Sequence, residues 1–494
     1  MSMSMSITST MRLIADQSDI HFGTSGVRGL VANMTDPVCY AYSQAFLGAL
    51  APDARQVVVG HDLRPSSPRI AAACIQAIID AGLEAVFAGA LPTPAVANYC
   101  ALNKIPGIVI TGSHIPFDRN GIKFYRADGE IDKADEHAIL EAVITIPASL
   151  VPAPLPLVDP APLQTYIERY TSFFAEGALA GKQVALYEHS SVARDVLRTI
   201  LEKLGAQVLS LGRTDTFVPI DTEAVRPEDI EQARVWASEH RFDAILSTDG
   251  DADRPLIGDE NGTWMRGDVV GILCAQYLHA NVVVTPVSSN SAVEKCASFE
   301  AVVRTRIGSP YVIAGMQTAQ LARPDAIVVG YEANGGFLLG SDVKSNDVNS
   351  NDAILTALPT RDAVLPMLAL LALSTLKGCP LSQLSGHLPP RFTASDRIVN
   401  VSAEASRRLI GILSQDALQA AELMAPTSEQ VIAQDSTDGL RVTFATGDVV
   451  HLRPSGNAPE LRCYAEADTQ ARAQELCVAC LQRVGARLNC TPGA

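Results

Sequence analysis

Three aspartates at alternating positions are the most distinctive chemical pattern in this sequence of 494 residues. They are Asp249, Asp251 and Asp253 in the segment DGDADR, which follows the apolar run FDAILS. Carboxylates spaced in this way on a loop can converge on one hard cation, and three of them suit Mg²⁺. EF-hand calcium loops share the spacing, but they need a glycine where this sequence has Arg254, and they follow a helix rather than a strand. The pattern therefore favours a magnesium site, with Arg254 placed to attract a phosphate group.

A serine in the segment TGSHIPFDRNGIKFY is a second candidate for chemistry. Ser113 follows the apolar run GIVI, so we expect it at the carboxyl edge of a sheet, where the sites of α/β proteins form. The glycine before it permits a sharp turn, and the basic residues His114 and Lys123 could stabilise a phosphate on it. An ordinary loop serine shares these features, and the sequence does not support the G-x-S-x-G nucleophile of an α/β-hydrolase.

Two further loops contain residue types that bind sugars and phosphates. GYEANGGF, at Gly330–Phe337, presents Glu332 and Asn334 after another apolar strand, and a carboxylate with an amide can bind two sugar hydroxyls. RPSGNAPELR, at Arg453–Arg462, combines arginine with serine, glycine and asparagine in a way that suits a phosphate dianion. Each loop also has a purely structural interpretation, because Asn-Gly-Gly is a turn signal and the second loop lies between two predicted strands.

A strand–helix–strand unit that occurs three times predicts the elements that position these loops. The units begin at Val57, Val184 and Val282 with β-branched runs, continue with a helical pattern that a glycine ends, and return to a second apolar run. This alternation predicts βαβ units and mainly parallel sheets. The last part of the chain alternates strand-like runs with helices differently, so we expect an α/β protein with a smaller C-terminal α+β domain.

Proline and glycine clusters predict the domain boundaries. Six prolines lie between Pro147 and Pro162, which indicates a linker, and further breaks are predicted near Gly258 and after Gly378. The resulting division has five parts: a disordered tail at 1–20, α/β domains at 21–155, 156–258 and 259–378, and an α+β domain at 379–494.

Bulk properties exclude several classes of protein. The net charge of −16 opposes binding to nucleic acid or an anionic membrane. Ten scattered cysteines are typical of buried thiols in a reducing compartment. The first residues lack the pattern of a signal peptide, and the most apolar run, Leu365–Leu376, is too short to span a bilayer. We therefore expect a cytoplasmic monomer or homodimer whose partners are small molecules.

Taken together and in this order, the four loops and the segment FGTSGVRG at Phe22–Gly29 resemble the α-D-phosphohexomutase superfamily. The resemblance covers nearly the whole chain after its first twenty residues. It implies three similar α/β domains and a smaller fourth domain around a central cleft. It also implies an enzyme that interconverts sugar 1-phosphates and 6-phosphates through a phosphoserine. One Mg²⁺ per chain would be needed, and a hexose 1,6-bisphosphate would be the intermediate and activator.

The resemblance also implies a role for each loop. Ser113 would carry the phosphoryl group and complete the magnesium ligand set of the three aspartates. Lys123 would be the acid–base residue. The other residues implied near the reacting phosphate are His114, Arg28 and Arg254. Those implied to bind the sugar hydroxyls or the phosphate that is not reacting are Glu332, Asn334, Arg453, Ser455, Gly456, Asn457 and Arg462.

The sequence departs from the family pattern at two places. Ile115 stands where relatives more often have Asn, which removes a possible hydrogen bond. The stretch Thr305–Met316 has no His or Lys after Arg306, so Lys123 is a candidate base without a visible partner.

The sugar loop gives a substrate prediction. The Gln-Ser-Gly-His ending of phosphoglucosamine mutases is absent, and GYEANGGF resembles the loop of bacterial phosphomannomutases. The resemblance therefore implies conversion of mannose 6-phosphate to mannose 1-phosphate, which would feed GDP-mannose. Glucose phosphates, alone or as well, are the alternative, because one hydroxyl contact often discriminates by only about 1–3 kcal/mol. A phosphoglucosamine mutase, a non-catalytic sugar-phosphate binder and a metal-dependent phosphatase are further alternatives.

Overall fold

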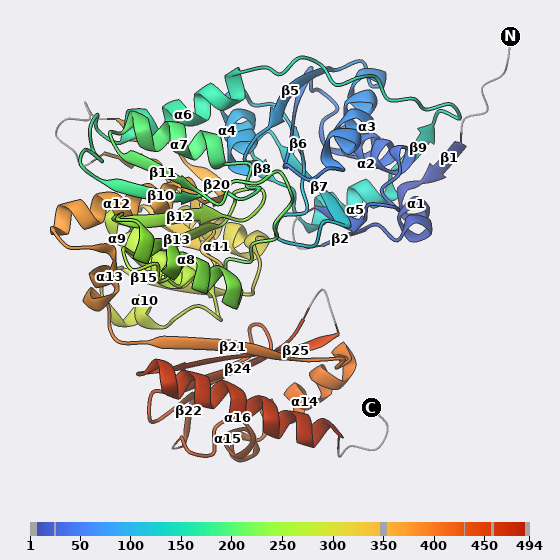
Figure 1. The fold of residues 1–494 in the computed structure, drawn as a ribbon. Coiled ribbons are helices and arrows are strands. Elements are labelled where there is room, and N and C mark those ends of the chain that lie inside the picture. The colour runs from blue at the N-terminus through green and yellow to red at the C-terminus, as the bar shows by residue number, and fades with distance from the viewer. Residues whose placement is uncertain (1–6, 24–25, 346–352, 429, 456–458, 490–494) are drawn as a thin grey trace, which may run out of the picture. The chain divides into compact units, whose positions relative to one another are not determined.

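The computed structural model describes residues 7–23, 26–345, 353–428, 430–455 and 459–489, and the chain forms two compact units (Figure 1). The first unit comprises the chain up to Ala280 together with Met316–Leu384. The second comprises Asn281–Gly315 and the chain from Ser385 onward.

The first sheet has seven strands in the order β2-β3-β7-β6-β4-β5, with β8 beside β7. Strands β5, β4 and β6 are parallel, as the repeated pattern predicts, while β7 runs antiparallel to β6 and β3 runs antiparallel to β7. The strand bounds are β2 His21–Phe22, β3 Val27–Leu30, β4 Gln56–His61, β5 Glu84–Ala90, β6 Gly107–Ile110, β7 Arg119–Arg126 and β8 Gly129–Glu130.

Four helices accompany this sheet, and α2 packs against α3 (Figure 1). The sequence of α3 explains its limits, because a proline occupies its first turn and Gly82 follows it with a left-handed backbone (φ 75°). The apolar residues on its inner face, including Ile70 and Ile78, are buried in the core of this sheet, whereas Ile79 is exposed. The helix bounds are α2 Asp36–Leu50, α3 Ser67–Asp80, α4 Thr93–Asn103 and α5 Lys133–Glu141.

The prediction of a disordered tail at 1–20 is wrong for residues 7–18. Strand β1 (Ile7–Thr10) pairs antiparallel with β9 (Val143–Ile146), and helix α1 (Met11–Ser18) follows at once. Met11 is fully buried in the core of the first sheet. The partner strand lies 137 positions away along the chain, so no local pattern announces the pairing.

The second sheet has the order β11-β10-β12-β13, in which β10 runs parallel to β11 and β12 and only β13 is antiparallel. The segment with the three aspartates joins β12 to β13. The bounds are β10 Gln183–Tyr187, β11 Gln207–Leu211, β12 Ala244–Thr248, β13 Pro255–Gly258, α6 Ala161–Phe173, α7 Arg194–Lys203, α8 Pro227–Glu239 and α9 Gly267–Tyr277.

The rest of the first unit contains an antiparallel run of strands, β16-β17-β20, and a short ribbon of β18 and β19. Among the described residues no single helix is long and apolar enough to cross a membrane. Helix α12 and the segment Leu381–His387 pass that test only as a bent pair, and α12 is buried along most of its length. The bounds are β16 Val328–Tyr331, β17 Phe337–Leu339, β18 Val343–Lys344, β19 Ile354–Leu355, β20 Leu358–Asp362, α12 Val364–Lys377 and α13 Leu381–Leu384.

The second unit holds the parallel pair β14 and β15 and an antiparallel sheet in the order β21-β25-β24-β23-β22. No glycine ends the helix of the third repeat, contrary to the pattern of the first two. Ala297 takes the left-handed position after α10 instead (φ 51°). The strand bounds are β14 Val282–Pro286, β15 Ala301–Thr305, β21 Phe392–Val399, β22 Val431–Asp435, β23 Leu440–Phe444, β24 Val449–Pro454 and β25 Glu460–Ala467.

The C-terminal sheet packs its apolar side chains into a separate core with α14, α15 and α16. The boundary between the two units at Gly315 and Met316 lies within helix α11. The helix bounds are α10 Ala292–Lys295, α11 Ser309–Ala322, α14 Ala403–Gln415, α15 Ala417–Met424 and α16 Gln470–Asn489, with a short 3₁₀ helix at Ser385–His387.

The burial of α1 predicts that Met11→Ala lowers the free energy of unfolding by about 2–4 kcal/mol, because it leaves a cavity in the core. Leu13→Ala on the exposed face of the same helix, where the leucine is 49% exposed, should change it by about 0.5 kcal/mol or less. Urea unfolding of both variants measures the difference. Equally small effects would mean that this segment does not pack on the core.

Candidate active site

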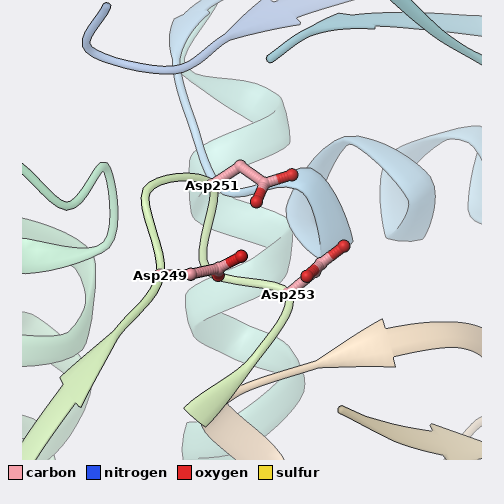
Figure 2. Close-up of side chains that lie close together, drawn as sticks. All are labelled: Asp249, Asp251 and Asp253. Carbon is pink, nitrogen blue, oxygen red and sulfur yellow. The ribbon is translucent and has the colours of Figure 1, made fainter. Parts of the chain in front are cut away.

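The three aspartates lie together on the turn between β12 and β13, as Figure 2 shows. One ligand oxygen from each of Asp249, Asp251 and Asp253 lies within 4.8 Å of the others, and all three side chains are buried. Asp251 Oδ1 and Asp253 Oδ1 are buried without a hydrogen-bond partner among the described residues. Buried carboxylate oxygens that lack hydrogen bonds and lie close together are the donor set that a hard divalent cation requires. The residues present therefore fit Mg²⁺.

Contacts from the first sheet fix the position of this turn. Thr93, at the start of α4, donates its hydroxyl to Asp251 Oδ2 at 2.7 Å and its backbone N–H to Asp251 O at 3.0 Å. A Cβ on Gly250 would lie 2.8 Å from Ser113 O, so only glycine permits the two loops to approach this closely. The role of Thr93 could not be predicted from the sequence, because its partner lies in another βαβ unit.

Ser113 directly follows the strand β6, as predicted, and its side chain meets the aspartates. Its Oγ donates to Asp249 Oδ2 at 2.6 Å, and its backbone N–H donates to Thr111 Oγ1 at 2.8 Å. The backbone of Ser113 is left-handed (φ 52°), which is uncommon for a residue with a Cβ and needs support from its surroundings. The structure therefore joins the predicted phosphate carrier to the predicted metal loop.

Two buried cations neutralise the aspartates. Lys123 Nζ lies 2.7 Å from Asp251 Oδ2 and 2.7 Å from Asp253 Oδ2. Arg361 Nη2 lies 2.7 Å from Asp253 Oδ2. Sequence reasoning did not find Arg361, because its partner is 108 positions away and the residues around it form an ordinary strand end.

The pKa values in this cluster follow from burial and charge. Burial and the neighbouring Asp251 and Asp253 raise the pKa of Asp249 well above its usual range. Burial alone would raise the pKa of Asp253 too, but Arg361 and Lys123 outweigh it and hold that pKa well below its usual range. Burial favours a neutral Lys123, yet the two carboxylates raise its pKa, so this lysine is protonated at neutral pH.

Arg28 and Arg254 complete the charge of the site, and His114 does not contribute to it. Burial first, and then repulsion from Arg254 and Arg361, lowers the pKa of Arg28 to about 10, so it stays charged at neutral pH. Arg254 donates from Nη1 to His114 Nδ1 at 3.0 Å. Burial and Arg254 lower the pKa of His114 to about 3. His114 is thus a neutral hydrogen-bonding group here, although the sequence suggested a basic one.

The sugar-type loop connects to the same cluster through Arg361. Its Nη1 donates to Glu332 Oε2 at 3.0 Å, and both side chains are buried. Asn334 Oδ1 accepts from the N–H of Gly336 at 2.9 Å, so the turn that Asn-Gly-Gly predicts is present. Thr222 donates to Asn334 O at 2.7 Å and holds this loop.

The fourth predicted loop belongs to the second compact unit. Arg453, on β24, donates from Nε to Asp438 Oδ2 at 2.8 Å, and the same oxygen accepts from the backbone N–H of Ile307 at 3.0 Å. Arg462 lies opposite Arg453 in the ladder of β24 and β25, which confirms the predicted hairpin, and Ser455 is buried at the end of β24. Two predicted residues lie outside the described residues: Gly456 and Asn457.

Four protein-family models cover most of the chain in the expected order. They are the α/β/α domains I, II and III and the C-terminal domain of phosphoglucomutase/phosphomannomutase, and they match residues 19–148, 164–262, 266–392 and 415–482. The chain belongs to the phosphoglucomutase/phosphomannomutase family. Its four-domain architecture is that of the family, and the exact boundaries predicted above stay a prediction.

Curated relatives in this family carry two activities in their names. A phosphomannomutase from Salmonella muenchen is 45% identical over 480 residues, which is 96% of this chain and 98% of the relative. A phosphomannomutase from Sinorhizobium fredii is 45% identical over 466 residues, covering 92% of this chain and 96% of the relative. A phosphoglucosamine mutase from Moorella thermoacetica is 31% identical over 494 residues, covering 94% of this chain and 99% of the relative.

Solved structures of other family members share the fold. A crystal structure from Thermus thermophilus has a TM-score of 0.72 at 21% identity and covers 94% of this chain and 99% of its own. The N-acetylphosphoglucosamine mutase of Aspergillus fumigatus, solved with GlcNAc-6P and magnesium, has a TM-score of 0.58 at 13% identity, with coverage of 96% and 99%. At these identities the likeness concerns the fold alone.

A buried histidine holds the strand that leads into the metal loop. His189 Nε2 lies 2.9 Å from Thr248 O, directly before Asp249, so the protonated nitrogen of the neutral ring donates to this carbonyl. Burial lowers the pKa of His189 to about 4. The unfolded chain, with a histidine pKa near 6.5, therefore binds a proton between about pH 6.5 and 4 that the folded protein excludes.

Acidification over this range should consequently destabilise the fold. The stabilising contribution of His189 is complete above about pH 6.5 and decreases by about 1.4 kcal/mol per pH unit as the pH falls toward 4. His189→Asn, which tolerates the left-handed backbone at this position (φ 25°), should reduce the slope of unfolding free energy against pH by about one proton. Urea unfolding at several pH values tests this, and an unchanged slope would contradict the assignment.

Proposed function

We propose that this chain interconverts mannose 6-phosphate and mannose 1-phosphate by transferring a phosphoryl group to and from Ser113. The observation that supports this most directly is the contact of Ser113 Oγ with Asp249 at 2.6 Å, inside a buried cluster of carboxylates and cations. The 45% identity to two phosphomannomutases over nearly the full chain supports mannose as the sugar.

The reaction has two half-reactions that balance each other. A hydroxyl oxygen of the sugar phosphate loses its proton and attacks the phosphorus on Ser113, the bond from phosphorus to Oγ breaks, and a hexose 1,6-bisphosphate forms. Ser113 Oγ then attacks the other phosphorus of the bisphosphate, the bond from that phosphorus to the sugar oxygen breaks, and the sugar oxygen takes up a proton. Arg28 and Arg254 are proposed to hold the transferring phosphate, since fixed charges that need no rearrangement stabilise it best.

Magnesium is proposed as the cofactor, held by Asp249, Asp251 and Asp253 together with an oxygen on Ser113. When bound, it supplies positive charge to the transferring phosphoryl group. The raised pKa of Asp249 indicates that this carboxyl tends to keep a proton when no cation is near, so binding of a cation should release one. The magnesium in the related Aspergillus fumigatus structure supports the choice of ion.

Lys123 is proposed as the acid–base residue, and its ion pairs determine whether it acts as the acid or as the base. Paired with Asp251 and Asp253 it is protonated, so it can donate a proton but cannot accept one. When a cation engages these carboxylates, their effect on Lys123 weakens and burial favours the neutral amine. Acid and base roles would then alternate with the state of the aspartates.

The remaining predicted residues are proposed to bind substrate. Glu332 would accept hydrogen bonds from sugar hydroxyls, and the amide of Asn334 could donate to them or accept from them. The phosphate that is not reacting would lie at the hairpin between β24 and β25, where the described residues include Arg453 with its Nε held by Asp438. With Nε engaged, the two Nη groups of Arg453 are oriented as a fork that suits a phosphate.

Ser113→Ala should abolish mutase activity, because no other group replaces the phosphate carrier, while the melting temperature should change little. Ser238→Ala, at an exposed helix position, is the matched serine control and should retain activity. The measurements are a coupled mutase assay and the intact mass of the protein, which should show one phosphate on Ser113 that substrate removes. Substantial turnover by Ser113→Ala would contradict the phosphoserine mechanism. Steady release of inorganic phosphate would indicate a phosphatase. A protein mass that substrate does not change would indicate a non-catalytic binder.

The sugar assignment predicts a ranking of kcat/KM. Mannose 1-phosphate should exceed glucose 1-phosphate by about tenfold, the scale of one hydroxyl contact, and glucosamine 1-phosphate should be slower still. The 31% identity to a phosphoglucosamine mutase is the reason to include the amino sugar. Equal values for the three sugars would remove the mannose assignment while leaving the phosphoserine chemistry intact.

A further inference from the structure

Arg64 is a fully buried arginine in the segment HDLRPSS after β4, and every N–H of its guanidinium has a partner. An arginine side chain has five such donors. Four of them reach backbone carbonyls of the loop that contains Ser113, and the fifth reaches Asp62 Oδ2 at 3.2 Å. The carbonyl contacts are Ser113 O at 2.9 Å, Ile115 O at 2.5 Å, Pro116 O at 2.7 Å and Arg119 O at 3.0 Å.

Asp62 binds the same loop at a backbone N–H. Its Oδ2 accepts from the N–H of Gly112 at 3.2 Å as well as from Arg64 Nε. Its Oδ1 accepts from the N–H of Arg64 at 3.0 Å and from the hydroxyl of Ser67 at 2.6 Å. The pair thus binds both N–H and C=O groups of a loop that has no strand partner of its own along these residues.

Two groups, Gly112 and Phe217, pack directly against the guanidinium. A Cβ on Gly112 would lie 2.5 Å from Arg64 Cζ, so the glycine lets the guanidinium rest directly on the backbone before Ser113. The ring of Phe217 covers the guanidinium with its centroid 4.1 Å from Cζ, a distance typical of a cation–π contact. Phe217 comes from the loop after β11, so it connects the serine loop to the sheet that carries the aspartates.

We infer that Arg64 is a positioning residue that sets the reactive conformation of the Ser113 loop. All five donors are engaged by protein groups, so Arg64 has none left for a phosphate and acts through the loop rather than on the substrate. Arg64 donates a hydrogen bond to Ser113 O, and Ser113 N–H donates one to Thr111 Oγ1. Together these two bonds hold Ser113 in a left-handed backbone conformation that a serine on its own disfavours. That backbone directs Oγ at Asp249. The inference rests on the proposed function, because it concerns the geometry of the same serine.

Lysine is the sharpest replacement, because it keeps the charge but has only three donors on one nitrogen and cannot reach four carbonyls at once. The matched control is Arg483→Lys. Arg483 also binds backbone carbonyls, Leu423 O at 2.7 Å and Met424 O at 2.9 Å, but these belong to the core of the C-terminal domain. A second variant, Phe217→Leu, changes a half-buried loop residue and removes only the aromatic cover of the guanidinium.

The experiment follows a single phosphoryl transfer. Each full-length protein is phosphorylated with glucose 1,6-bisphosphate in Mg²⁺, mixed with mannose 1-phosphate, and quenched for intact-mass measurement of the phosphate remaining. Steady-state KM and the melting temperature are measured in parallel. We expect Arg64→Lys to slow the transfer about 100-fold with KM changed less than about threefold, since misplacing a reacting group by about 1 Å has an effect of this size. Phe217→Leu should slow it about 3- to 10-fold.

Arg483→Lys should transfer at the rate of the unchanged protein even if its melting temperature falls as far as that of Arg64→Lys. The inference is overturned if Arg64→Lys transfers at the normal rate, or if both lysine variants lose rate in proportion to stability. Should Arg64→Lys fail to fold, Phe217→Leu decides, and a normal rate for it overturns the inference. If the unchanged protein loses no phosphate to the sugar, the proposed function fails instead.

Discussion

The placement of three buried carboxylates within 4.8 Å of one another is the constraint on which the rest of the site depends. Like charges in a dry interior repel strongly, and the raised pKa of Asp249 is the direct result. Nearby cations limit this repulsion, so the first unit collects as many basic as acidic side chains around the turn. The acidic set is Asp249, Asp251, Asp253 and Glu332, and the basic set is Lys123, Arg28, Arg254 and Arg361. A divalent cation and a phosphate dianion carry equal and opposite charge, so binding both together brings no net charge into the site.

The fold supplies this cluster from strand ends. Ser113 follows β6, the aspartates follow β12 and Glu332 follows β16, so each sheet presents one loop of the site at the carboxyl end of a buried strand. Strands fix where the loops begin, but the loops need additional contacts to reach one another. Thr93, Arg64 and Asp62 provide them with hydrogen bonds to backbone groups that no secondary structure supplies.

Much of this arrangement could be predicted from the sequence, because it depends on local patterns. Alternating aspartates after an apolar run, or a proline and a glycine at the two ends of α3, are visible within a few residues. Groups whose partners are remote could not be predicted. The carbonyls that Arg64 binds lie 49 to 55 positions away. Every residue has a backbone carbonyl, so residue types do not indicate which of them an arginine will bind. Arg361 and strand β1 were missed for the same reason, and the neutral state of His114 depends on its burial and on an arginine 140 positions away.

Arg361 has a consequence for how this protein can change over generations. One guanidinium serves both Asp253 on the metal turn and Glu332 on the sugar loop, so these two loops do not mutate independently. A substitution of Glu332 that suits a new sugar leaves Arg361 with one anionic partner and alters the charge beside Asp253. If Glu332 binds the sugar as proposed, a lineage that adopts another hexose has to change Glu332 and Arg361 together, or accept altered charge beside Asp253 while it passes through the intermediate sequence.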